Sequence, residues 1–150
     1  MSPRPTSDRP VVLLVSSDRG RLLDLADVLS VEFEVTFAVD AREAAAELVR
    51  RTPTVVLTDL AVGGMKGPTF VRWLRTRRGG TRAPVAVLAD DSNAHASALA
   101  IQAGAQAVID AGVPARELLD KVRRLVRRSQ PVPRGDAMPI IYIPKAPKVG

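Results

Sequence analysis

Asp59 is the residue of this chain whose type and position best fit a chemical role. It follows the apolar segment 55–58 and precedes a glycine-rich loop at 60–67. A carboxylate at the carboxyl end of a parallel strand lies where open α/β sheets hold their ligands and reaction sites. This layout suits a phospho-accepting aspartate, and carboxylates are also the ligands that Mg²⁺ prefers. Asp59 is therefore the candidate acceptor of the chain.

Five apolar segments alternate with five helical patterns, and these elements must position Asp59. The predicted strands are 11–15, 33–38, 54–58, 84–89 and 107–109, and the predicted helices are 19–30, 41–51, 68–78, 93–103 and 114–128. Strands separated by helices favour parallel βαβ units, and continuous apolar strands are typical of a sheet that is buried on both faces. The sequence thus predicts an α/β fold with a doubly wound, five-stranded parallel sheet.

Local signals fix several helix ends and inward faces. Asp18 and Asp40 are expected to cap helix starts, and Gly104 is expected to close the helix at 93–103. Helical spacing predicts that Val49 and Ile101 face the core. Polar and small residues then gather at the carboxyl edge of the sheet: Ser16, Ser17, Asp18, Asp59, Ala89, Asp90, Asp110 and Ala111.

Composition indicates a single domain between two tails. The chain has 150 residues, is 46% apolar, and contains no cysteine, so neither a disulfide framework nor a thiolate metal site is expected. We predict a disordered N-terminus at 1–9, a domain at 10–128 and a proline-rich tail at 129–150. No signal-like or membrane-spanning apolar run is found, which favours a cytoplasmic protein. The net charge of +6 permits attraction to nucleic acid, anionic lipid or an acidic partner without choosing among them.

Four segments in this order resemble the receiver domain of bacterial two-component response regulators. They are 11–18, 56–67, 84–88 and 103–105, and the resemblance covers about residues 10–128. It implies a flavodoxin-like fold with strand order 2-1-3-4-5. In that family two acidic residues end the first strand and hold Mg²⁺ with the acceptor aspartate, a Ser or Thr ends the fourth strand, and a lysine ends the fifth.

The chain departs from the family at each of these supporting positions. Ser16 and Ser17 replace the acidic pair, Ala89 replaces the Ser or Thr, and Ala111 replaces the lysine. Phosphoryl transfer depends on positioning and on stabilisation of spreading negative charge, so these losses should leave Asp59 inactive. We predict a pseudo-receiver that is not an enzyme, has no cofactor or metal, and binds protein partners without phosphorylation. The alternative is a working phosphorelay receiver that is phosphorylated on Asp59 by a histidine kinase and uses Mg²⁺.

Other roles for the charged residues at this edge remain open. Asp59 can be held by Thr58, by Lys66 or by backbone N–H groups, and Lys66 or Arg19 can form an ion pair with it. Asp18, Asp90, Asp91 and Asp110 offer a displaced cation site, although helix caps and turns also suit them.

A surface formed by the last two helices and the strand between them is the docking and dimer surface that the resemblance implies. The candidate interface residues are Leu99, Val108, Leu118, Arg123, Arg127, Ile141 and Tyr142, with a homodimer as one outcome. The segment 138–143 can add as a strand to a sheet edge or stay disordered. Sequence-specific nucleic-acid binding is not favoured, because the arginines at 123–128 lack interleaved aromatics and a helix-turn-helix partner. Trp73 is expected to pack beside the core or anchor a partner, and His95 to lie on the surface.

Overall fold

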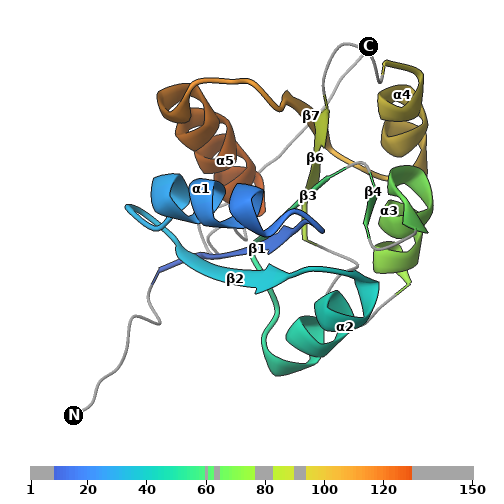
Figure 1. Ribbon diagram of the computed structural model, residues 1–150, viewed down its shortest axis with the longest axis horizontal. Helices are drawn as coiled ribbons and strands as arrows, with labels where there is room; N and C mark the ends of the chain where they lie inside the picture. The colour runs from blue at the N-terminus through green and yellow to red at the C-terminus, as the bar shows by residue number, and fades with distance from the viewer. Residues whose placement is uncertain (1–8, 60, 63–64, 77–82, 90–93, 130–150) are drawn as a thin grey trace, which may run out of the picture.

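The computed structural model describes residues 9–59, 61–62, 65–76, 83–89 and 94–129. Five parallel strands form one sheet in the order β2-β1-β3-β6-β7 (Figure 1). They are β1 (Val11–Val15), β2 (Glu34–Ala38), β3 (Val55–Asp59), β6 (Val85–Ala89) and β7 (Ala107–Asp110). The predicted fold class and strand order are confirmed. The expected tails lie outside the described residues, apart from Arg9 and Ser129.

Helices cover both faces of the sheet (Figure 1). They are α1 (Arg19–Leu29), α2 (Ala41–Arg50), α3 (Gly67–Arg75), α4 (Ala94–Ala103) and α5 (Ala115–Ser129). Side chains alternate across each strand, so Leu13 and Val15 pack in the core on the α2, α3 and α4 side. Val12 and Leu14 pack in a second core on the α1 and α5 side.

The expected helix signals have the predicted geometry. The Asp18 carboxylate accepts a hydrogen bond from the Arg21 backbone N–H at 3.1 Å, and that of Asp40 accepts one from Glu43 N–H at 2.8 Å. Gly104 ends α4 with a φ of +123°, a conformation that side-chain-bearing residues rarely adopt. These caps explain why most of the predicted boundaries lie within about one residue of the observed ones.

The structure corrects two inward assignments and adds one element. Val49 is 84% exposed and Ile101 is 45% exposed, whereas Ala100 is fully buried. Periodicity is a weak guide in α4, because nearly every residue there is small or apolar. Two short antiparallel strands, β4 (Ala61–Val62) and β5 (Met65–Lys66), form a hairpin in the expected acceptor loop.

Arg75 fastens the end of α3 to the turn between α4 and β7. Its guanidinium donates to the carbonyl oxygens of Ala83 at 2.8 Å and Gly104 at 2.7 Å, and to the Gln106 side-chain oxygen at 2.6 Å. Burial lowers the pKa of Arg75 from its usual value. Trp73 stacks on Phe70 with ring centroids 5.6 Å apart, so it packs on the flank of the core.

Candidate functional site

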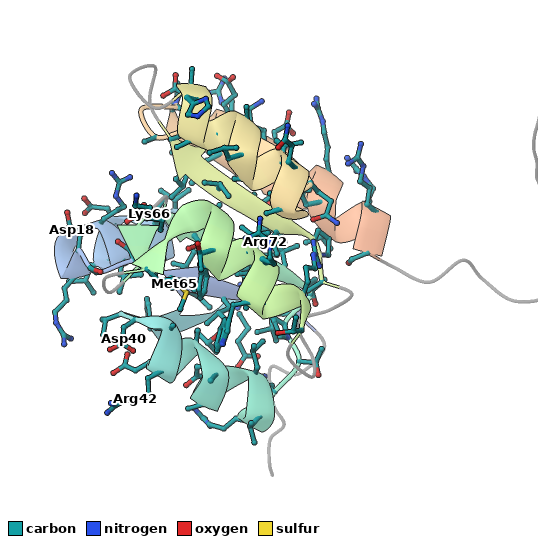
Figure 2. The ribbon with its side chains drawn as sticks, turned by 90° about the vertical axis from the view of Figure 1, so that its right-hand side faces the viewer. Asp18, Asp40, Arg42, Met65, Lys66 and Arg72 are labelled. Atoms are coloured by element: carbon teal, nitrogen blue, oxygen red, sulfur yellow. The ribbon has the colours of Figure 1, made fainter. Side chains whose placement is uncertain are left out.

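The carboxyl ends of the strands bring the expected site residues to one edge of the sheet. Thr58 of β3 lies opposite Val15 of β1, so Ser16, the next residue after β1, lies beside Asp59. On the other side, Ala89 at the end of β6 lies opposite Asp110 of β7. Figure 2 shows Asp18, Asp40 and Lys66 at this same end of the molecule.

Ser16 holds one oxygen of the Asp59 carboxylate. Its hydroxyl donates a short hydrogen bond to Asp59 Oδ2, and its Oγ accepts from the backbone N–H of Asp18 at 3.0 Å. Ser16 is only 1% exposed, and it is one of two buried polar side chains among the described residues. A buried hydroxyl without partners would be costly, and here the acceptor carboxylate and the cap of α1 satisfy it.

Arg21 approaches the other oxygen of the same carboxylate. Its Nε lies 3.5 Å from Asp59 Oδ1, and the Asp59 side chain is 18% exposed. Arg21 reaches this position because its own backbone N–H is the one that Asp18 caps at the start of α1. The two carboxylate oxygens thus face a hydroxyl donor and a guanidinium, and the negative charge of Asp59 has a cationic partner inside the chain.

The expected partners of Asp59 lie elsewhere. Lys66 and Arg19 are exposed, and neither forms an ion pair with Asp59 in the described part of the chain. The Thr58 hydroxyl donates to the backbone carbonyl of Asp59 at 3.1 Å, and not to its carboxylate. Sequence reasoning therefore missed Arg21, although its place three residues after the cap Asp18 was a usable signal.

Of the three remaining site positions, Ala89 and Ala111 offer no polar side chain. Ala89 is buried, and the backbone N–H of Ala111 donates to the Ala89 carbonyl at 2.8 Å. Ser17 is exposed, with its hydroxyl 3.4 Å from the Val39 carbonyl oxygen. A polar cavity of about 480 Å³ opens beside Ala111, between Asp18, Gly20, Arg21, Asp24 and Leu25.

Magnesium, the ion that the family resemblance implies, does not fit this donor set. Mg²⁺ is usually held by carboxylates in near-octahedral geometry, and here two serines replace two carboxylates. The remaining carboxylate already accepts from Ser16 and faces the positive charge of Arg21. No group of three His, Asp or Glu side chains in the described residues is arranged to hold a metal ion.

Two of the carboxylates that the sequence offered for a displaced cation site have local structural roles. Asp18 caps α1, and Asp110 accepts from the Gly112 N–H at 2.9 Å in the turn after β7. Asp90 and Asp91 lie outside the described residues.

The candidate interface residues divide into four groups, of which the last is Arg123, described below. Leu99 and Val108 are exposed, as is Arg127, while Ile141 and Tyr142 lie outside the described residues. Leu118 is 3% exposed and packs from α5 into the core, so the prediction that it lies in an interface is wrong. His95 lies on the surface, as predicted.

Arg123 is engaged in an ion pair within the chain. Its Nε donates to both carboxylate oxygens of Glu32, at 2.9 and 2.8 Å, which ties α5 to the segment between α1 and β2. Hydrogen bonding to Arg123 lowers the pKa of Glu32, and the same contact raises the pKa of Arg123. Arg123 therefore has a structural partner and is not a free interface cation.

Comparison with known proteins agrees with the observed fold. Residues 12–123 match the response regulator receiver domain. The sensory transduction protein RegX3 of Mycobacterium tuberculosis is 30% identical over 118 residues, which are 78% of this chain and 51% of that protein. The sensor histidine kinase TmoS of Ectopseudomonas mendocina is 30% identical over 86 residues, which are 57% of this chain and 9% of that protein. The chain thus spans about half the length of RegX3.

Solved structures share the fold at lower sequence identity. NtrX from Brucella abortus, solved in complex with ADP, has a TM-score of 0.75 and 23% identity, covering 81% of this chain and 28% of that one. The receiver domain of the sensor histidine kinase PA1611 from Pseudomonas aeruginosa, solved with a magnesium ion in its active-site cleft, has a TM-score of 0.71 and 21% identity. That match covers 79% of this chain and 98% of the PA1611 domain.

Receiver domains in general are non-enzymatic modules of two-component signalling that interact with kinases and other proteins. In the described part of this chain, no helix is long and apolar enough to cross a membrane. The match to the family extends over most of the chain and coincides with the observed five-stranded sheet. The chain belongs to the response regulator receiver domain family.

Proposed function

We propose that this chain is a pseudo-receiver, a module that binds protein partners in bacterial signal transduction without phosphorylation of Asp59. The observation that carries the proposal is the pair of contacts on the Asp59 carboxylate. Ser16 donates to one oxygen, and Arg21 faces the other. Asp59 then acts as a structural anion that joins β1, β3 and α1.

The chemistry of phosphoryl transfer supports this reading. The protein must supply a metal ion and fixed positive groups where charge spreads over the transferred phosphoryl oxygens. Ser16, Ser17, Ala89 and Ala111 stand at the four positions that supply these groups in the family. Removal of a single such donor typically costs about 3 kcal/mol of barrier, so the joint loss leaves self-phosphorylation negligible.

Arg21 adds a further obstacle to an incoming phosphoryl group. The guanidinium and the Ser16 hydroxyl make the carboxylate a weaker nucleophile, because both stabilise the negative charge that a carboxylate oxygen would donate to phosphorus when it forms an acyl phosphate. The arginine also occupies the rim, since its side chain lines the polar cavity beside Ala111.

Protein binding is the output that remains when phosphate control is absent. Leu99 and Val108 are exposed apolar side chains on α4 and β7, the surface on which the resemblance places docking and homodimer contacts. A domain of this size, active in the cytoplasm, can present such a surface permanently. A second copy of the chain or a kinase-like partner would bind this surface with an affinity that does not depend on phosphorylation.

The second candidate is a phosphorelay receiver, and one observation favours it. Asp59 keeps its place at the end of β3, with a carboxylate that is partly open to solvent. A histidine kinase could in that case supply the missing positive groups from its own surface.

Incubation with acetyl phosphate and Mg²⁺ tests the proposal. We expect no phosphoryl adduct on Asp59 by intact-mass spectrometry, and no rise in the thermal midpoint with Mg²⁺, because binding to the native state alone would raise it. The matched control restores the family groups with Ser16→Asp, Ser17→Asp, Ala89→Thr and Ala111→Lys. This variant should gain a Mg²⁺-dependent midpoint and an adduct. A stoichiometric adduct on the unaltered chain would overturn the proposal.

A further inference from the structure

The strand β2 forms one edge of the sheet (Figure 1), and among the described residues it pairs only with β1. The backbone N–H of Glu34 donates to the residue before β1, and the carbonyl of Ala38 accepts from the residue after it. Alternation along the strand therefore directs the N–H and C=O groups of Val35 and Phe37 away from β1. Unpaired backbone groups on an edge strand are a template for a further strand.

The middle of this edge is uncharged and partly apolar. Phe37 is 42% exposed, and Val35, on the same face of the sheet, is half-buried. Edge strands are commonly protected from pairing by lysine, by proline or by a charge in the strand. The only charged residue of β2 is Glu34 at its start, and Glu34 forms an ion pair with Arg51 at 2.8 Å.

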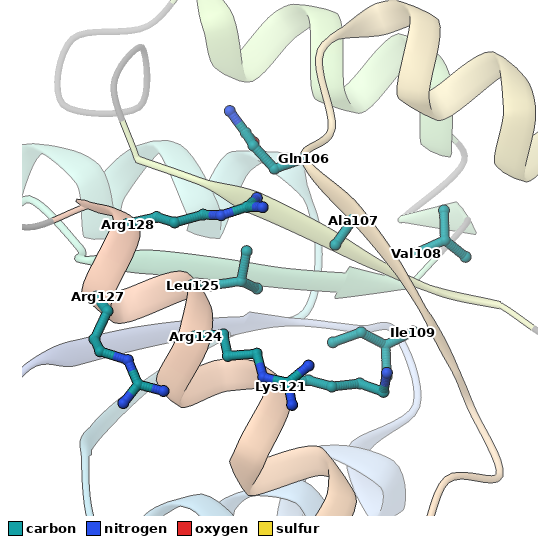
Figure 3. Close-up of a pocket in the computed structure, with 9 residues that line it drawn as sticks. All are labelled: Gln106, Ala107, Val108, Ile109, Lys121, Arg124, Leu125, Arg127 and Arg128. Carbon is teal, nitrogen blue, oxygen red and sulfur yellow. The ribbon is translucent and has the colours of Figure 1, made fainter. Parts of the chain in front are cut away.

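The opposite edge strand, β7, has cations beside it. A groove of about 470 Å³ along β7 is lined in part by Lys121, Arg124, Arg127 and Arg128 of α5 (Figure 3). Figure 3 shows Lys121 and Arg124 extending side by side from α5 near Ile109. Two copies of the chain that met at β7 would bring like charges together, which is unfavourable. Of the two edges, β2 is therefore the one that suits pairing between copies.

We propose that two copies of this chain pair through β2, in antiparallel orientation about a two-fold axis at Thr36. The two five-stranded sheets then form one continuous sheet. In this register Val35 of each copy lies opposite Phe37 of the other, and the outward N–H and C=O groups of both residues all find partners. Pairs of an aromatic and a β-branched side chain across neighbouring strands are favourable. The same patch serves both copies, as a two-fold interface requires.

The flank of α1 above this edge is complementary to itself. Arg21 points toward Asp59 in β3, and two residues along a helix turn by about 200°, so Leu23 points to the opposite flank, toward β2. Leu23 is 63% exposed, and Arg19 and Asp27 are exposed four residues to either side of it. An antiparallel copy of α1 centred on Leu23 would place Leu23 against Leu23, and Arg19 against Asp27.

The helices and the strands can share one two-fold axis. The helix α1 begins beside Val39 at one end of β2 and ends beside Phe33 at the other, so Leu23 lies about level with Thr36. Both α1 and α2 lie over β1 and β2. Because neighbouring strands are about 4.8 Å apart, each of these helices would lie about 10 Å from its copy. This is a usual distance between packed helices, so the pairing would join both faces of the sheet as well as its edge.

This inference goes beyond the proposed function, and the two proposals fail independently. A phosphoryl adduct on Asp59 would overturn the pseudo-receiver and leave the β2 edge unchanged. A monomeric chain would leave the chemistry of Asp59 untouched. The pairing also leaves the Leu99 surface uncovered, since α4 lies over β6 and β7 on the far side of the sheet. Each dimer would present that surface twice, so a partner with two sites could bind with avidity.

Sedimentation velocity of the full chain over a range of concentrations measures the Kd of the dimer. Phe37→Lys should raise this Kd by at least about tenfold, because it places a lysine opposite the partner's Val35. The matched control is Val49→Lys, which also replaces an exposed apolar side chain. Glu43 of α2 holds the Val39 N–H at the sheet edge, and Val49, six residues further, is turned away from that flank. The control should leave the Kd unchanged, and circular dichroism checks that both variants keep their fold.

Disulfide cross-linking tests the register, because the chain has no cysteine of its own. Residues that face each other in a non-hydrogen-bonded antiparallel pair have Cα atoms about 4.5 Å apart, which is within the reach of a disulfide. Thr36→Cys should therefore give a covalent dimer under mild oxidation. Val49→Cys carries a more exposed thiol and should stay uncoupled. Leu99→Cys should also stay uncoupled, because the two copies of Leu99 would lie at opposite ends of the joined sheet.

Four results would overturn the proposal. The first is a monomer at all concentrations up to about 1 mM. The second is an equal Kd for Phe37→Lys and Val49→Lys. The third is cross-linking of Leu99→Cys or Val49→Cys in preference to Thr36→Cys. The fourth is a nuclear Overhauser contact from Tyr142 to Phe37 within one copy, because the chain's own tail would then occupy the edge.

Discussion

Replacement of Ser16 by alanine tests whether its hydroxyl holds Asp59. The substitution removes the donor to Asp59 Oδ2 and the acceptor of the Asp18 N–H, while it changes the volume of the side chain very little. A hydrogen bond to a charged group contributes about 1.5–3 kcal/mol to stability. Water can replace part of the lost bond, because the Asp59 side chain is 18% exposed. We therefore expect a loss of about 1.5–2 kcal/mol in the free energy of unfolding.

A double-mutant cycle isolates this interaction from other effects of the substitution. Ser16→Ala is compared in the unaltered chain and in a chain that carries Asp59→Ala. In the second background the hydroxyl has lost its charged acceptor and keeps only the bond from the Asp18 N–H, so its removal should cost about 0.5–1 kcal/mol. The coupling energy between the two sites is then about 1 kcal/mol.

Urea unfolding followed by circular dichroism measures all four free energies. In the unaltered background Ser16→Ala should also lower the thermal midpoint by about 3–8 °C. Equal costs in the two backgrounds, within about 0.5 kcal/mol, would show that Ser16 and Asp59 do not interact. That result would refute the account of Asp59 as an anion held inside the chain.

Three further predictions concern the scaffold. Gly104→Ala should destabilise the protein by about 1–3 kcal/mol, because the φ of Gly104 is +123° and an added Cβ would lie 3.1 Å from Arg75 Nε. An unchanged urea midpoint would contradict this prediction. Leu118→Ala truncates a core side chain and should lower the free energy of unfolding by about 2–5 kcal/mol, whereas Leu99→Ala should change it by no more than about 0.5 kcal/mol. Similar urea midpoints for the two variants would contradict this difference in burial. Arg123→Gln should reduce stability at neutral pH and have no effect at pH values below the folded pKa of Glu32. Because the folded pKa of Glu32 is lowered, the stability that its ion pair contributes is fully present above the unfolded pKa of Glu32 and is lost as the pH falls through the folded pKa. A difference in stability between the variant and the unaltered chain that stayed constant across this pH range would contradict the prediction.

Much of the fold was predictable because its signals are local. The apolar segments at 11–15 and 84–89 differ from their helical neighbours in period and length, and caps such as Asp18 and Gly104 mark helix ends. The α4 face was not predictable in the same way. Its residues are mostly small or apolar, so the pattern gives no preferred side, and only packing identifies Ala100 as the inward residue.

The site was predictable in location and only partly in its contacts. Parallel strands end at the same edge, so the sequence alone indicated that Ser16 and Asp59 lie together. It did not indicate that the hydroxyl donates to the carboxylate, which depends on side-chain rotamers. Arg19 and Arg21 both lie in the first turn of α1, and the direction of that turn decides that Arg21 is the residue that reaches Asp59.

The sparse anchoring of α4 has a consequence for how its outer surface behaves. Ala100 is its only fully buried residue, and the turn that follows it accepts two hydrogen bonds from Arg75, at Gly104 and Gln106. Opening of this helix would expose little apolar surface, so its local unfolding requires less free energy than that of the strands beneath it. A molecule that covered Leu99 and Ile101 would add apolar contact to the outer side of this helix. Binding there would rigidify α4, and the cost of that ordering would be subtracted from the affinity.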